Sequence, residues 1–85
     1  MENDQAKVNV TYNGANGDLV DPVLFDASDA QVRGWITEAL RTGGIPGIPA
    51  DPGADVSDFV IDRFSATEVR PYNLLSLRPK TPFGA

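Results

Sequence analysis

The strongest structural signal in this 85-residue sequence lies between positions 28 and 42, which read Ser28-Asp-Ala-Gln-Val-Arg-Gly-Trp-Ile-Thr-Glu-Ala-Leu-Arg-Thr42. Val32, Ile36 and Leu40 recur at intervals of four residues, which places them on one face of a helix. Trp35 stands beside this apolar face, where we expect an aromatic side chain to add to the core. The stretch therefore predicts an amphipathic helix over 29–42 that packs on a sheet.

Both ends of this helix carry capping residues. Ser28 and Gln31 have the spacing of a capping box, in which each side chain hydrogen-bonds the backbone amide of the other residue. Asp29 adds a negative charge at the positive end of the helix dipole. Gly43 suits the left-handed residue that ends a helix. These residues set the predicted boundaries.

Two strands are predicted before the helix. Residues 7–12 alternate apolar and polar side chains, as in a half-buried strand. Residues 13–17 contain two Asn-Gly pairs, which favour a hairpin turn. Residues 18–25 then form a second strand. Pro22 places this strand at an edge of the sheet, because proline lacks the amide that bonds to a neighbouring strand.

A long loop and a third strand are predicted after the helix. Residues 44–55 contain three prolines and three glycines, which exclude a regular element. Within this loop, Ile45 and Ile48 are expected to tuck under the end of the helix. Residues 59–64 form the third strand, and a short strand is expected near 67–69.

Residues 73–78 form the last predicted strand. Its nearly continuous apolar character is typical of a central strand that is covered on both faces. Leu74 or Leu77, depending on the register, is expected to contribute to an exposed apolar patch. Since the second strand lies at an edge, the first and last strands become a central parallel pair.

The composition narrows the possible functions. The chain has 12 acidic and 7 basic residues and a net charge of −5, which argues against nucleic acid as a partner. It contains no Cys and no His, which excludes disulfides and removes the commonest general base. We therefore expect no enzyme, no catalytic residue, no metal and no cofactor. Asp51, Asp55 and Asp58 are interpreted as a solvated acidic loop, because their spacing does not fit a calcium-binding loop.

No apolar run is long enough to cross a membrane, and the first residues do not resemble a signal peptide. We expect a monomer in the cytoplasm, with no membrane contact. The predicted organisation is a disordered N-terminus over 1–6, one domain over 7–78 and a flexible tail over 79–85.

The order strand, turn, strand, helix, long loop, strand, strand predicts an α+β domain with a mixed sheet of four or five strands covered by one helix. In this order the chain resembles the β-grasp proteins of the ubiquitin-like family, and among them a bacterial ubiquitin-like modifier. The resemblance rests on four features: the hairpin over 8–25, the capped helix over 28–41, Ile45-Pro46, and the strand over 74–78 that leads to Phe83-Gly84-Ala85. The sequence departs from the family in reading Gly-Ala where Gly-Gly is expected.

The resemblance implies a protein modifier that partner enzymes conjugate to targets. A processing peptidase would remove Ala85, and an activating enzyme would adenylate the Gly84 carboxylate with ATP. A conjugating enzyme would then pass the chain to its target. Glycine suits this position because it has no Cβ to block attack at the carbonyl. Phe83 precedes it in a tail that Pro79 and Pro82 would hold extended.

Partner enzymes also need a surface to bind. Arg63, Arg70, Arg78 and Lys80 are either a solvated face or a basic surface that docks in an acidic groove. The candidate partner-binding residues are Arg70, Leu77, Arg78 and Lys80.

Two other functions stay open. One is a non-conjugated β-grasp interaction module, such as an adaptor or a subunit of a secretion or defence assembly. The other is a sulfur carrier, which would require a terminal Gly-Gly.

Overall fold

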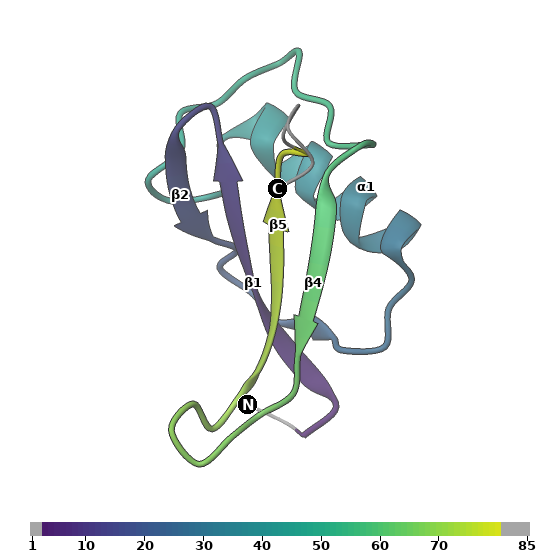
Figure 1. Ribbon diagram of the computed structural model, residues 1–85. Coiled ribbons are helices and arrows are strands. Elements are labelled where there is room, and N and C mark those ends of the chain that lie inside the picture. The colour runs from purple at the N-terminus through teal and green to yellow at the C-terminus, as the bar shows by residue number, and fades with distance from the viewer. Residues whose placement is uncertain (1–2, 81–85) are drawn as a thin grey trace.

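The computed structural model describes residues 3–80, and Figure 1 shows α1 packed against one face of the sheet. In chain order the elements are β1 (Gln5–Tyr12), β2 (Ala15–Asp18), β3 (Val23–Leu24), α1 (Asp29–Thr42), β4 (Val60–Phe64) and β5 (Asn73–Arg78). Residues 3–80 therefore form an α+β fold, with a mixed five-stranded sheet and one helix. The predicted class and the predicted two layers are confirmed.

The centre of the sheet is the pair β1 and β5. The strand order is β2-β1-β5-β4, and β3 also pairs with β1. β1 and β5 run parallel, with Val8 opposite Leu75 and Val10 opposite Leu77. The other pairings are antiparallel. The expected central parallel pair of first and last strands is thus confirmed.

The second strand differs from the prediction. The turn is only Asn13-Gly14, both with positive φ of 51° and 79°, so β2 already begins at Ala15. The strand expected over 18–25 is instead split into β2 and β3, which pair with opposite ends of β1. Pro22 lies in the gap between them, where no ladder bond is required of it. The expected edge position of this segment holds for β2.

The first strand also begins earlier than expected. β1 starts at Gln5, and the carbonyl of Asp4 accepts a hydrogen bond from the amide of Phe25. Ala6 is completely buried and pairs with both β3 and β5. Disorder was expected over residues 1–6, but Gln5 and Ala6 form the first residues of β1 and the Asp4 carbonyl bonds to Phe25. Residues 1–2 lie outside the described residues.

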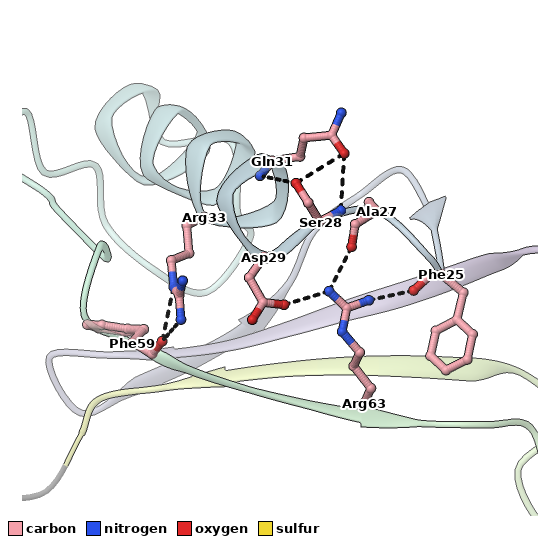
Figure 2. Close-up of polar contacts among 8 residues, drawn as sticks. All are labelled: Phe25, Ala27, Ser28, Asp29, Gln31, Arg33, Phe59 and Arg63. Atoms are coloured by element: carbon pink, nitrogen blue, oxygen red, sulfur yellow. Dashed lines mark hydrogen bonds and ion pairs between the residues drawn. The ribbon is translucent and has the colours of Figure 1, made fainter.

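The helix has the predicted boundaries and caps. The amide of Gln31 donates to the Ser28 hydroxyl, and the amide of Ser28 donates to the Gln31 side chain, as Figure 2 shows. Gly43 closes the helix with a left-handed φ of 74°. A side chain would be strained in that conformation.

The helix buries its apolar face on the sheet. Val32, Ile36 and Leu40 have almost no exposed area, and neither do Val8, Val10, Leu75 and Leu77 of the central strands. Trp35 is different, because 42% of its surface is exposed. The expectation that it packs in the core was wrong. One residue along a helix is a rotation of about 100°, so Trp35 points away from the direction of Ile36.

The last strand is covered on one face only. The helix lies behind the sheet in Figure 1. Leu75 and Leu77 are fully buried and belong to the same core cluster as the helix residues Val32, Ile36 and Leu40. Leu74 faces the other way and is half-buried. The expected cover on both faces of β5 was wrong, and the register selects Leu74 rather than Leu77 for the open side.

The proline-rich loop completes the core. Ile45 and Ile48 are buried as expected, together with Ala54 and Val56. The loop approaches β2 so closely that a Cβ on Gly17 would lie 2.4 Å from the carbonyl oxygen of Pro46. Only glycine allows this approach. The loop thus acts as part of the packing around the helix end.

Candidate interaction face and tail

The sheet face that α1 leaves uncovered is called the open face here. On the open face the register places Lys7 of β1, Leu74 of β5 and Phe64 of β4 in one row across the sheet. Phe64 is 45% exposed, and Leu74 is half-buried. This row brings together side chains that lie far apart in the sequence.

Two cations cover the aromatic rings beside this row. The Lys7 ammonium lies 4.9 Å from the centroid of the Tyr72 ring. The Arg70 guanidinium lies 5.8 Å from the Phe64 centroid and 5.7 Å from that of Tyr72. Such contacts stabilise the cation without neutralising its charge. We call Lys7, Phe64, Arg70, Tyr72 and Leu74 the aromatic–cationic patch.

Arg70 also organises the loop that joins β4 to β5. Its Nε donates to the Tyr72 carbonyl and its Nη2 to the Ser65 carbonyl. Its backbone amide donates to the hydroxyl of Thr67, whose own amide donates to the Arg70 carbonyl. The loop is a closed turn, and the short strand expected near 67–69 does not form. Val69 stands at its tip with 96% of its surface exposed.

The other half of the open face is polar. Asn9 of β1 donates to the side-chain oxygens of Asn16 and Asp18 on β2, at 2.9 and 2.8 Å. Arg78 of β5 pairs with Asp62 of β4, with an Nε to Oδ2 distance of 3.1 Å. The patch therefore has a polar boundary on the side of Asn9 and Asp62, where the open-face side chains form hydrogen bonds and an ion pair.

The structure separates the predicted partner-binding residues. Leu77 is fully buried under the helix, so assigning it to a partner surface was wrong. Arg70 lies before the start of β5, and Arg78 and Lys80 lie at or beyond its end. β5 separates them, and its length from Asn73 to Arg78 is about 17 Å, from five residue steps of about 3.3 Å. Arg78 is ion-paired on the open face, and Lys80 is exposed.

Arg63 does not belong to the open face at all. Figure 2 shows it on the helix side, where it donates to the carbonyls of Phe25 and Ala27 and pairs with Asp29 at 2.7 Å. The hydrogen bond from Arg63 lowers the pKa of Asp29. The four cations near the last strand therefore do not form one basic surface. The tail residues Phe83, Gly84 and Ala85 lie outside the described residues.

Sequence reasoning missed Lys7, Phe64 and Tyr72 as site residues. Lys7 and Phe64 lie on different strands, 57 positions apart in the sequence. They come together because both pair with Leu74, Lys7 through the β1–β5 register and Phe64 through the β4–β5 register. Strand alternation could have placed each on the open face, but no local pattern gives the register between distant strands.

The acidic loop carries a hydrogen-bonded pair. The Tyr12 hydroxyl donates to Asp51 at 2.5 Å, and the Gly53 amide donates to the other carboxylate oxygen at 3.0 Å. These bonds lower the pKa of Asp51, and the bond to Asp51 raises the pKa of Tyr12. Among residues 3–80, no cluster of acidic side chains has the geometry to hold a metal ion. Asp51 thus fastens the loop to the end of β1.

The arrangement has the chemistry of a binding surface. It offers two cations, two aromatic rings and a leucine to a partner that brings carboxylates and apolar groups. No helix in the described part of the chain has the length and apolar character needed to span a bilayer. A comparison with known proteins finds no matching family model, no matching curated sequence and no matching solved structure.

Proposed function

We propose that this chain is a ubiquitin-like protein modifier with a β-grasp fold, conjugated to targets through Gly84. The fold supports this proposal in one respect. A hairpin leads into a helix that covers a sheet whose central strands, β1 and β5, are the first and last strands and run parallel. That order is the one expected for a β-grasp protein.

The observation that carries the proposal is how the chain leaves the sheet. β5 is a central strand, and it ends at Arg78 and passes directly into exposed Pro79 and Lys80. Proline at 79 has no amide to donate, so the ladder ends with β5 at Arg78.

The proposed chemistry uses the chain as an acyl group rather than as a catalyst. A peptidase hydrolyses the bond between Gly84 and Ala85. The Gly84 carboxylate then attacks the α-phosphorus of ATP and displaces pyrophosphate, which gives an acyl adenylate. A nucleophile of a partner enzyme attacks the carbonyl and releases AMP. Every catalytic group belongs to the partners, which fits a monomeric protein without His or Cys acting in the cytoplasm.

The aromatic–cationic patch supports binding that is compatible with this chemistry. It lies at the end of β5 opposite to the end that leads to Lys80, and Leu74 is about 13 Å from Arg78 along the strand. A partner on the patch therefore does not need to cover Arg78 or Lys80. The same patch also fits the second candidate function, a non-conjugated interaction module, because it needs no tail.

Variants of the tail separate the two functions. The protein is expressed with the genes that neighbour its own, and conjugates are followed as heavier bands with an antibody against the domain. Gly84→Val should abolish conjugates, because a branched side chain crowds the carbonyl. Deletion of Ala85 should give conjugates without the peptidase. Ala85→Ser is the matched control, since its processed product is identical to that of the unmodified sequence.

The thermal midpoint of each variant should equal that of the original protein, because the changes leave every core residue of the described part of the chain intact. Conjugates that persist in Gly84→Val would contradict the proposal. Their absence from the original protein in the presence of all neighbouring gene products would favour the interaction module.

A further inference from the structure

A groove lies on the outer flank of α1, on the helix side of the molecule and away from the open face. Its volume is about 470 Å³. Its lining includes Ala30, Gly34 and Thr37 of the helix and Ser57 of the loop that leads to β4. This loop passes beside the helix in Figure 1. No residue of the aromatic–cationic patch lines this groove, and neither do Pro79 and Lys80.

Gly34 in this groove is not required by the fold. It sits in the middle of α1 without a positive φ, and a Cβ built there meets nothing within 4 Å. Glycine inside a helix is less stable than alanine, because it loses more backbone freedom on folding. The domain therefore carries a cost at this position without a gain in packing. A partner gains from it, since its backbone can approach the helix more closely.

Two arginines stand at the ends of the same groove in fixed positions. Arg33 donates from Nε and Nη2 to the carbonyl of Phe59, at 3.2 and 2.9 Å, as Figure 2 shows. Arg41 donates from Nε to the carbonyl of Ala54 at 2.8 Å. Their Cα atoms are eight residues apart, or about 12 Å along the helix. In both cases the hydrogen-bond acceptor is a neutral backbone carbonyl.

The charge of the groove is opposite to that of the chain. Its lining holds Arg33 and Arg41 against a single carboxylate, Glu38, while the whole chain carries −5. Two carboxylates outside the lining also interact electrostatically with these arginines, Asp29 with Arg33 and Asp55 with Arg41. Within residues 3–80, none of the three charged side chains of the lining forms an ion pair. Arg41 has both Nη atoms, and Arg33 has Nη1, without a hydrogen-bond partner in that part of the chain. Guanidinium nitrogens in this state bind carboxylates well, since the planar groups match.

We propose that this groove binds an extended segment of a partner protein with two carboxylates about 12 Å apart. One carboxylate bonds to Arg33 and the other to Arg41, while the backbone between them passes over Gly34. Glu38 lies between the two cations, so it repels a third acidic residue at the centre of the segment. A row of phosphates would meet the same repulsion, which favours a protein over a nucleic acid. This surface goes beyond the proposed modifier function and does not depend on it.

The probe for this proposal is the peptide acetyl-Glu-Pro-Ala-Pro-Glu-amide. Its prolines hold it extended, so its end residues lie about 12 Å apart at about 3.1 Å per residue. It is titrated into the full ¹⁵N-labelled chain, and amide shifts are followed by NMR. We expect the shifts to concentrate at Gly34, Thr37 and Ser57. The same peptide with Gln at both ends should bind at least about tenfold more weakly, as expected for lost charge-assisted bonds.

Two variants test the geometry. Arg41→Gln should weaken binding by about tenfold, since it removes one charged partner. Val20→Glu is the matched control: it lowers the net charge equally at a residue that is 71% exposed outside the groove, and should leave binding unchanged. Gly34→Ala should weaken binding and yet raise the thermal midpoint by about 2–5 °C, because alanine stabilises the helix.

Three outcomes would overturn the proposal. Gly34→Ala that raises the midpoint but leaves peptide affinity unchanged would show that the missing Cβ does not serve binding. Shifts centred on Lys7 and Arg70 would place the acidic segment on the open face instead. Equal weakening by Val20→Glu and Arg41→Gln would reduce the effect to net charge.

Discussion

Four of the five arginines in this chain bind backbone carbonyl oxygens rather than carboxylates alone. Arg33, Arg41, Arg63 and Arg70 each donate to carbonyls of loops or of loop-to-strand junctions. Loop carbonyls need such donors, because no neighbouring strand or helix supplies an amide. The cations that look like a basic surface in the sequence therefore hold loops in place. Only the three-dimensional structure distinguishes these two uses of arginine.

Arg70 should contribute more to stability than Arg78. Arg70→Ala removes two side-chain hydrogen bonds and two ring contacts. We expect it to lower the free energy of unfolding by about 1–3 kcal/mol. Arg78→Ala, the matched control, removes one exposed ion pair and should cost at most about 1 kcal/mol. Urea denaturation of both variants measures the difference, and equal costs would show that the loop does not depend on Arg70.

The Tyr12–Asp51 pair should make stability depend on pH in acid. The pKa of Asp51 is lowered in the folded chain, so its contribution is present above the unfolded value of about 3.9. That contribution is lost as the pH falls through the folded pKa. The pKa of Asp29 and that of Asp55 are also lowered, and these carboxylates act in the same direction.

Removal of the tyrosine hydroxyl tests this contribution. Tyr12→Phe removes the first cause of the lowered pKa of Asp51. The thermal midpoint of the variant should therefore fall less steeply between pH 5 and pH 2 than that of the original protein, by the reasoning that links proton binding to stability. Identical slopes would show that the hydrogen bond does not persist in solution.

At the scale of the elements, the helix could be predicted from local residues alone. Its face, its capping box and its C-terminal glycine are all encoded within sixteen residues, from Ser28 to Gly43. The strands could be placed only approximately, because pairing joins residues that are far apart. No residue near Asp18 indicates that β2 ends there. The predicted second strand divides into β2 and β3 because the two parts pair with opposite ends of β1. Whether one or both faces of β5 are buried also depends on how many helices pack on the sheet. The sequence of the strand itself does not contain that information.

Ile36 should be the most sensitive position of the helix. Its side chain has no exposed area and lies at the centre of the buried face. Ile36→Ala should lower the free energy of unfolding by about 2–5 kcal/mol, a large share of the stability of a small domain. Glu38→Ala on the exposed side should change it by less than about 0.5 kcal/mol. A thermal midpoint that Ile36→Ala leaves unchanged would refute the packing of this face.

At the scale of the whole molecule, the chain has two distinct sides. The helix side carries the groove between Arg33 and Arg41, and the open face carries the aromatic–cationic patch. The sequence predicted Arg70 as a site residue and Leu74 as one of two candidates for the exposed patch. It could not predict their neighbours Lys7 and Phe64, because these come together through strand register. The tail chemistry remains a prediction from residues 83–85.

The overall charge should keep nucleic acids away. The chain carries −5, and its cations are distributed over both sides. Any binding to a DNA or RNA oligonucleotide at low salt should disappear near physiological ionic strength, because few phosphate contacts are available. Fluorescence anisotropy over a salt series measures this. Micromolar binding that resists salt would contradict the electrostatic argument.

The most direct test of the modifier function is the intact mass of the protein, purified after expression with its neighbouring genes. The account predicts a species lighter by one alanine residue, together with adducts joined through the Gly84 carbonyl to a target or to an enzyme. Tandem mass spectrometry locates the junction. A protein that keeps its intact 85-residue mass, with no adduct at Gly84, would contradict the account.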